Sequence, residues 1–238
     1  MKRSNMMKKY FAVILALVLL VSLAACGAKD NAPETTSDQP TGSAAQVSDG
    51  ETEESTNDAP AGEKKILTVY FSSANTANVD AVSSATPDFN GVASTELLAT
   101  YIHDAVGGDI VKITPAKDYP EDYNGTADAA KAERDADERP ADLPLDVDPE
   151  DYDVIFVGYP MWWYTLPMVM YTFFDDYDLS GKTIVPFNTH AGSGDGGTYA
   201  EIAEFEPNAT VLDGLAVSGS RVENARNDVA DWLNGLNY

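Results

Sequence analysis

Apolar and polar positions alternate in blocks from residue 65 to the end of the chain. Short apolar runs rich in β-branched and aromatic residues are typical of strands that are buried on both faces. Such runs cover residues 65–73, 109–115 and 152–159, a stretch within 181–192 and a stretch within 209–219. The sequence therefore predicts five strands.

Segments with helical periodicity separate these runs. In residues 94–106, Leu97, Leu98, Tyr101 and Ile102 form one apolar stripe, and two glycines follow it as a predicted helix end. Further helices are predicted over 123–138, a polar surface helix, and over 166–177, 198–205 and 222–236. Pro167 is expected in the first turn of its helix, where its missing N–H costs nothing. Strands that alternate with helices predict an α/β fold, with a doubly wound sheet of five parallel strands and helices on both faces.

The first 25 residues follow a different pattern. Four basic residues precede an apolar run over residues 10–25, which has the layout of a signal peptide and is too short to span a membrane comfortably. The run ends in Leu-Ala-Ala-Cys, and Cys26 is the only cysteine. This ending resembles the lipobox of bacterial lipoproteins, which implies cleavage before Cys26 and its lipidation. The alternative is an uncleaved signal anchor, and attachment of labelled lipid to Cys26 distinguishes the two.

Residues 27–63 are rich in Ser, Thr, Gly, Pro and acidic residues and contain almost no large apolar side chain. Such a segment cannot bury enough surface to fold, so it is interpreted as a disordered tether. The predicted organisation is a signal peptide (1–25), a lipid-anchored acidic linker (26–63) and one globular domain (64–238). The expected location is outside the cytoplasm, at the cell membrane.

The charge of the chain excludes several classes of partner. The formal net charge is −24, and removal of residues 1–25 takes away four basic residues and no acidic one, which leaves −28. Phosphates of nucleic acid and of anionic lipid would be repelled. Membrane attachment must therefore come from the acyl chains at Cys26. Two distant histidines and one lipidated cysteine do not suggest a metal site.

Candidate binding residues follow three of the predicted strands. Hydroxyls follow the first, adjacent aromatic residues the third, and a glycine-rich loop the fourth. Hydroxyls and helix N-terminal N–H groups can hold a phosphate, aromatic rings can flank a flat ring, and glycines let the backbone approach its edge. The nucleotide-binding signatures G-x-x-x-x-G-K and G-x-G-x-x-G are absent after the first strand. The pattern predicts a site for a planar heterocycle that carries a phosphate.

The segment YDVIFVGYPMWWYTLP, followed by DLSGKTIVPFNTHAGSG, resembles the bacterial flavodoxin-like family over nearly all of residues 64–238. The resemblance implies a five-stranded doubly wound fold that binds FMN without a covalent bond. It implies phosphate contacts from Ser72, Ser73, Ser94 and Thr95. It implies contacts with the flavin ring from Pro160, Met161, Trp162, Trp163, Tyr164, Thr189, His190, Ala191, Gly192, Ser193 and Gly194.

The first loop departs from the family pattern. Asn75 and Thr76 resemble a shortened copy of the usual phosphate turn, but Pro87 and the residues after it would break any helix that began there. Ser94 and Thr95 instead precede a full helix, with Ser94 expected to cap it. The second interpretation is preferred, and Asn75 and Thr76 are then expected to lie over the cofactor.

The predicted function is electron transfer, or FMN-dependent oxidoreductase activity, with either a redox partner protein or a small-molecule electron acceptor. The flavin carries the chemistry, so no catalytic acid or base is assigned. Negative surroundings and aromatic stacking would disfavour anionic reduced flavin and predict a low potential. His190 could donate to the pyrimidine edge of the flavin or serve only its own loop. The alternative function is a lipoprotein that has lost flavin and binds another, non-redox ligand.

The segment from Asp80 to Thr86, DAVSSAT, resembles the motif at which a flavin transferase attaches FMN through its phosphate to the final threonine. A phosphoester at Thr86 would keep an exported protein from losing FMN, whereas the simpler interpretation is an ordinary Ser/Ala loop. If the bond forms, flavin should stay with the exported protein after denaturation in acid. Complete release of flavin would exclude it.

Overall fold

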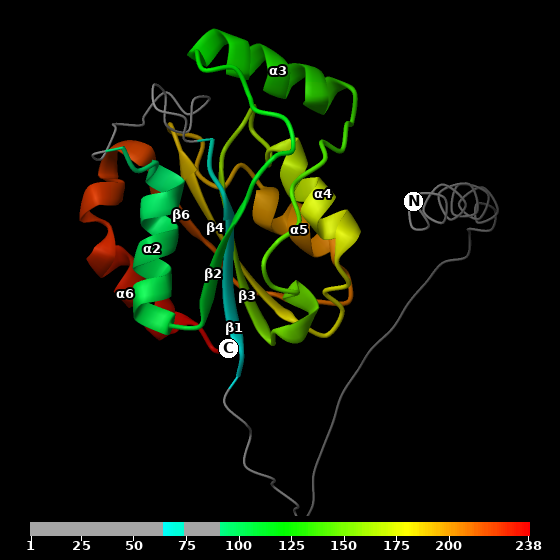
Figure 1. Cartoon of the computed structure of the whole chain (residues 1–238). Coiled ribbons are helices and arrows are strands. Elements are labelled where there is room, and N and C mark those ends of the chain that lie inside the picture. Colours follow the sequence, from blue (N-terminus) through cyan, green and yellow to red (C-terminus); the bar gives the residue numbers. More distant parts are fainter. Residues whose placement is uncertain (1–63, 74–90) are drawn as a thin grey trace, which may run out of the picture. The chain divides into compact units, whose positions relative to one another are not determined.

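The computed structural model describes residues 64–73 and 91–238, which contain a parallel sheet with helices on both faces (Figure 1). Its strands are β1 (Ile66–Phe71), β2 (Asp109–Ile113), β3 (Val154–Pro160), β4 (Thr183–His190), β5 (Thr210–Val211) and β6 (Leu215–Ser218). The strand order is β2-β1-β3-β4-β5, with β6 also on β4, and every pair is parallel. The predicted doubly wound α/β fold is confirmed.

The predicted fifth strand consists of two short pieces, because of a proline in its neighbour. The Leu212 N–H donates to the Ile184 carbonyl at 2.9 Å, so the backbone hydrogen-bonding groups of Ile184 point towards β5. The backbone groups of every second residue in a strand point towards the same neighbouring strand. Those of Pro186 therefore also point to this side, but proline has no N–H to donate. Ladder pairing stops at Ile184–Val211 and resumes at Phe187–Leu215, which leaves a bulge of one extra residue.

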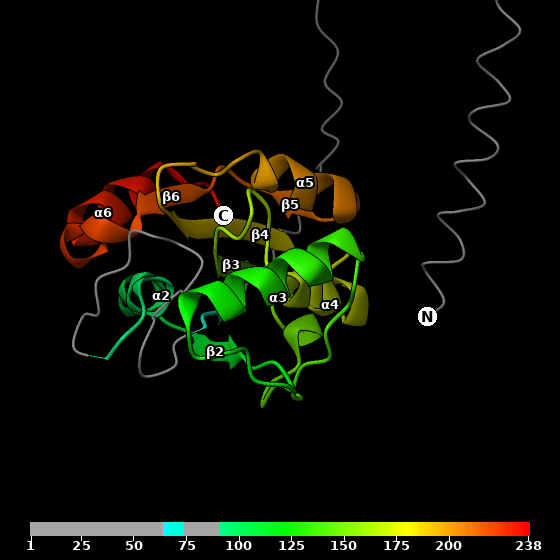
Figure 2. The ribbon, with the colours of Figure 1, turned by 90° about the horizontal axis from the view of Figure 1, so that it is seen from above.

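Helices cover the two faces of the sheet in separate layers. Figures 1 and 2 show α2 (Ser94–Val106) and α6 (Arg226–Gly235) on one face, and α4 (Met168–Asp176) and α5 (Thr198–Phe205) on the other. Helix α3 (Tyr123–Asp135) lies over the end of the sheet at which the strands finish. Two 3₁₀ helices, Pro149–Asp151 and Gly219–Asn224, complete the described elements.

Alternation along the central strands divides the core in two. In β3, Ile155, Val157 and Tyr159 pack in the cluster under α4 and α5, whereas Val154 and Phe156 pack in the cluster under α2 and α6. All five are fully buried. This pattern explains why the strand has a continuous apolar run: both of its faces are covered.

Helix boundaries differ from the prediction in three helices. Helix α3 ends at Asp135 rather than residue 138, and Pro167 occupies the N-cap of α4 rather than its first turn. Helix α6 begins at Arg226 rather than residue 222, because a 3₁₀ helix covers Gly219–Asn224. The predicted end of α2 is confirmed, since Gly107 caps it with a φ of +72°. No helix within residues 64–73 and 91–238 has the length and apolar character needed to cross a bilayer.

Several sequence predictions fall outside the described residues. They are the signal peptide (1–25), the linker (26–63) with the lipidation site Cys26, the alternative phosphate residues Asn75 and Thr76, and the flavin attachment motif with Thr86.

Gly158 provides a test of the packing between β3 and β4. A Cβ on Gly158 would lie 2.1 Å from Cζ of the fully buried Phe187, its neighbour on β4. We expect Gly158→Ala to lower the free energy of unfolding by about 1–3 kcal/mol, because the added methyl group has no room. Urea unfolding of the FMN-free protein measures this change.

Gly235→Ala is the matched control. No heavy atom lies within 4 Å of a Cβ added there, so replacing this helical glycine should raise the free energy of unfolding by about 0.5–1 kcal/mol. Equal effects at the two positions would contradict the packing described.

Candidate cofactor cleft

A tight turn after β3 carries two aromatic residues in an unusual conformation. Trp162 and Thr165 exchange backbone hydrogen bonds of 3.0 and 3.1 Å, and the two residues between them, Trp163 and Tyr164, have φ values of +52° and +65°. Primed two-residue turns need positive φ at both central positions and therefore favour Asn-Gly. Each aromatic residue here costs about 1–2 kcal/mol of backbone energy. Strain of this kind concentrates at functional sites.

The turn sends its neighbouring aromatic side chains to different places. Trp162 is 2% exposed, and its ring packs edge-to-face on Phe71 and Tyr119, with centroids 5.2 and 5.0 Å away. Trp163 is 37% exposed and Tyr164 is 77% exposed. Trp162 therefore belongs to the core, whereas Trp163 and Tyr164 are presented at the surface.

Helix α3 holds Trp163 in place. The indole Nε1–H of Trp163 donates to the Ala127 carbonyl at 2.9 Å, and the Arg134 guanidinium lies 5.4 Å from the ring centroid. Arg134 also donates to the Trp163 carbonyl at 3.5 Å. The sequence presents α3 only as a polar surface helix, and nothing in its periodicity signals this contact.

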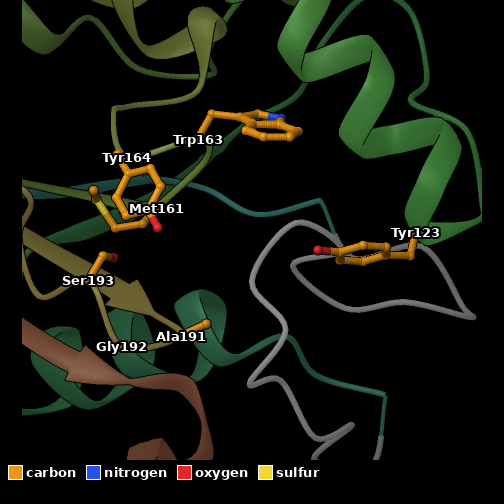
Figure 3. A pocket seen from close by; sticks show the side chains of 7 residues that line it. All are labelled: Tyr123, Met161, Trp163, Tyr164, Ala191, Gly192 and Ser193. Carbon is orange, nitrogen blue, oxygen red and sulfur yellow. The ribbon is translucent and has the colours of Figure 1, made fainter.

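The aromatic turn and the loop after β4 face one cleft. The cleft has a volume of about 460 Å³, and it is lined by Met161, Trp163, Tyr164, Ala191, Gly192, Ser193 and Tyr123 (Figure 3). Six of these residues come from the two loops that the sequence predicted to meet. Tyr123, the first residue of α3, was not predicted. None of the described residues that line the cleft carries a charge.

Buried side chains fix the loop after β4. The fully buried Asn188 donates through Nδ2 to the Gly194 carbonyl at 3.0 Å and accepts a hydrogen bond from the Tyr199 hydroxyl. Burial raises the pKa of Tyr199 far above its ordinary value, so this hydroxyl stays protonated and remains a donor. The conformation of the loop is therefore fixed by Asn188 and Tyr199, which do not themselves line the cleft.

His190 is an uncharged member of this loop. Its Nδ1 accepts the Gly192 N–H at 2.9 Å, which leaves the proton of the neutral ring on Nε2. Burial lowers the pKa of His190, although nearby Asp195 acts in the opposite direction. At neutral pH the side chain therefore offers a neutral donor rather than a positive charge.

The start of α2 carries an unpartnered hydroxyl. Ala93, not Ser94, is the N-cap of α2, and its side chain makes no capping hydrogen bond, so the expected cap by Ser94 is wrong. Ser94 is instead the first helical residue, where the side chain is fully buried and its Oγ has no partner in the described part of the chain. The Thr95 hydroxyl lies 2.7 Å from the Thr189 hydroxyl and links α2 to the end of β4.

Ser72 and Ser73 lie elsewhere. They line a second cleft, of about 360 Å³, together with Lys112 and Tyr119. The Lys112 ammonium is 3.5 Å from the Glu96 carboxylate, so its charge is already paired. The structure thus brings together the aromatic turn and the glycine-rich loop, while the hydroxyls that follow β1 line a different cleft.

Fold and site together define a doubly wound α/β protein with a cofactor-type cleft beyond the carboxyl ends of its strands. The chain belongs to the flavodoxin family, because the family model described as Flavodoxin matches residues 85–236, more than half of its length. None of the curated proteins matches the chain.

Solved structures with the same fold come from several bacteria. A protein from Bacteroides uniformis ATCC 8492 classed as a flavoprotein is 27% identical, with a TM-score of 0.56, over 72% of this chain and 98% of its own. One from Bacteroides eggerthii DSM 20697, classed likewise, is 29% identical, with a TM-score of 0.51, over 71% and 99%. A flavoprotein from Lactobacillus acidophilus NCFM in complex with FMN is 20% identical, with a TM-score of 0.51, over 68% and 98%.

Membership of the flavodoxin family supports FMN as the cofactor. The residues present fit this group. Exposed aromatic rings line the cleft, and the buried Oγ of Ser94 and Nε1 of Trp162 have no partner among described residues. Buried polar groups without partners are rare in folded proteins, and a bound group is one of their explanations.

The strained turn predicts a trade between stability and cofactor binding. Asparagine tolerates positive φ, so we expect Tyr164→Asn to raise the free energy of unfolding of the FMN-free protein by about 0.5–1 kcal/mol. Loss of the ring should also weaken FMN binding by about two- to tenfold. Urea unfolding and titration of FMN fluorescence measure the two effects.

Tyr164→Phe keeps the ring and the strain, so it should change neither quantity. If Tyr164→Asn gains stability but binds FMN as tightly as the original protein, the ring of Tyr164 does not contribute to FMN binding.

Proposed function

We propose that this chain is an FMN-binding flavoprotein that transfers electrons outside the cytoplasm while anchored to the membrane through Cys26. The observation that carries the proposal is the cleft in which the strained aromatic turn faces the loop after β4. Two bulky aromatic residues at turn positions suited to Asn-Gly cost backbone energy, and such strain is concentrated at functional sites.

The residues present have distinct parts in holding FMN. Trp163 and Tyr164 would flank the flavin ring, and residues 191–194 would approach its edge through the backbone. Ser94, Thr95 and the N-terminus of α2 would hold the phosphate through hydroxyl and N–H groups, without a cation. When bound, FMN supplies reversible uptake and release of electrons, and the protein supplies stacking, orientation and a local field.

The electrostatics of the protein favour a low potential. The described residues include 28 acidic and ten basic side chains, a net charge of −18. None of these basic residues lines the cleft. Six of them form ion pairs: Lys112, Lys131, Arg134, Arg139, Arg221 and Arg226. His190 is uncharged at neutral pH. Adding negative charge to the flavin is therefore unfavourable in this site.

The proposed location depends on the N-terminal segment. The signal-like run before Cys26 and the polar, acidic residues 27–63 support a domain held at a distance from the membrane by an extended tether. Covalent attachment of FMN at Thr86 belongs to the same proposal, because an exported protein could not recapture cofactor lost to the surroundings.

The visible spectrum of the full-length protein, purified after export, tests the proposal. We expect a yellow protein with the absorption bands of flavin, and quenching of FMN fluorescence when FMN is added to the cofactor-free form. We also expect the midpoint potential of bound FMN to lie below that of free FMN, because of the negative field. Spectroelectrochemical titration of bound and free cofactor in the same buffer measures this shift.

A colourless protein that leaves added FMN fluorescence unchanged would overturn the proposal. A bound potential above that of free FMN would contradict the electrostatic argument alone, because binding would still have been observed.

A further inference from the structure

A carboxylate in α5 lies beside the aromatic turn but does not line the cleft. Glu201 follows Gly197, the N-cap of α5, by one helical turn, and its N–H donates to the Gly197 carbonyl at 3.2 Å. The side chain is half-buried, and none of the ion pairs in the described part of the chain includes it. A charge that is partly buried without an ion-pair partner depends on hydrogen bonds for its stability. The hydrogen-bond partners of Glu201 therefore indicate its role.

Two hydroxyl groups meet this carboxylate. Tyr171 belongs to α4, which covers the same face of the sheet as α5, and its phenolic O–H donates to Oε1 of Glu201 (Figure 1). The Thr165 hydroxyl donates to Oε2 at 3.3 Å and lies 2.8 Å from the Tyr171 oxygen. Burial and the hydrogen bond to Glu201 raise the pKa of Tyr171, so its hydroxyl stays protonated. An ionised carboxylate can only accept, so the orientations of both hydroxyls are determined.

Thr165 is the residue that closes the aromatic turn. The hydrogen bonds to Glu201 and Tyr171 therefore attach the end of the turn to α4 and α5. The loop after β4 also touches the turn directly, since a Cβ on Gly196 would lie only 3.4 Å from the Tyr164 carbonyl oxygen. The two loops that line the cofactor cleft are thus joined by a close backbone contact and by the carboxylate of Glu201.

The aromatic turn needs such support because its backbone is strained. A strained conformation persists only when the surrounding structure fixes it more firmly than the turn itself does. Hydrogen bonds to an ionised group are about twice as strong as those between neutral groups, so a carboxylate is well suited to hold the turn. If fewer molecules have the turn in its binding conformation, the apparent affinity for the ligand falls in the same proportion.

We propose that Glu201 is a positioning residue that holds the aromatic turn against the loop after β4 and so preserves the shape of the cofactor cleft. It acts through Thr165 and makes no contact with the cofactor. This proposal rests on the proposed function only for the identity of the ligand, FMN.

The first test needs no cofactor. Hydrogen–deuterium exchange of the FMN-free full chain in detergent is followed by mass spectrometry on peptides that cover the turn. We expect Glu201→Ala to speed exchange of the Trp162 and Thr165 amides about three- to tenfold, because the turn opens more often. Glu201→Gln should restore slow exchange, because its amide oxygen still accepts from Tyr171 and its N–H can donate to Thr165. Unchanged exchange in Glu201→Ala would overturn the proposal.

The second test compares two tyrosines that each donate to a carboxylate. Tyr171 is 9% exposed and Tyr152 is 8% exposed, and the Tyr152 hydroxyl donates to Asp109 at 2.6 Å. Asp109 begins β2, so this second pair lies at the end of the sheet opposite the cleft. Tyr152→Phe is therefore a matched control for Tyr171→Phe.

Both phenylalanine variants should lower the urea midpoint of the FMN-free protein by a similar amount. Only Tyr171→Phe, like Glu201→Ala, should weaken FMN binding, by about three- to tenfold, and alter the visible circular dichroism of bound FMN. Fluorescence titration measures the affinity. Equal losses of affinity in Tyr171→Phe and Tyr152→Phe would show that binding follows overall stability and would overturn the proposal. Failure of the original protein to bind FMN would overturn the proposed function, whereas the exchange measurement would still test the role of Glu201.

Discussion

Two hydrogen bonds between Trp162 and Thr165 close the turn on which the cleft depends. They require positive φ at both central residues, Trp163 and Tyr164. The side chains of the turn therefore do not continue the alternation of β3. Trp162 is left to pack on Phe71 and Tyr119, so the strained turn is anchored to the core by one aromatic residue while it presents two others. The backbone energy of about 1–2 kcal/mol per residue is offset by this burial and by the contacts of Trp163.

Helix α3 connects the turn to the rest of the fold. It contacts the core through Ala127 and Ala130, whose small side chains let the helix lie close, and it accepts the indole N–H of Trp163. Its first residue then forms the far wall of the cleft. A surface helix can shape a binding site in this way because a single backbone carbonyl suffices to position an aromatic side chain.

The loop after β4 follows the same logic with different chemistry. Its glycines have no side chains, and its conformation is fixed by hydrogen bonds of Asn188 with Gly194 and Tyr199. His190 turns its Nδ1 towards its own loop and remains neutral because of burial. Together with the pairing of six basic side chains by acids, this leaves a cleft without positive charge in an acidic protein.

The sequence by itself determined the strands, the parallel topology and the two loops that meet at the cleft, because burial on both faces and helical periodicity are recorded locally in residue types. Tertiary structure decided which of the two adjacent tryptophans is buried: Trp162 lies in the same core cluster as Tyr159, although strand alternation would place them on opposite faces. It also decided the role of Tyr123, the break of the fifth strand opposite Pro186 and the cap of α2. Each of these features depends on contacts or hydrogen bonds between residues distant in the chain, or on the backbone dihedral angles of a turn. Local patterns of hydrophobicity contain no information about these interactions or angles.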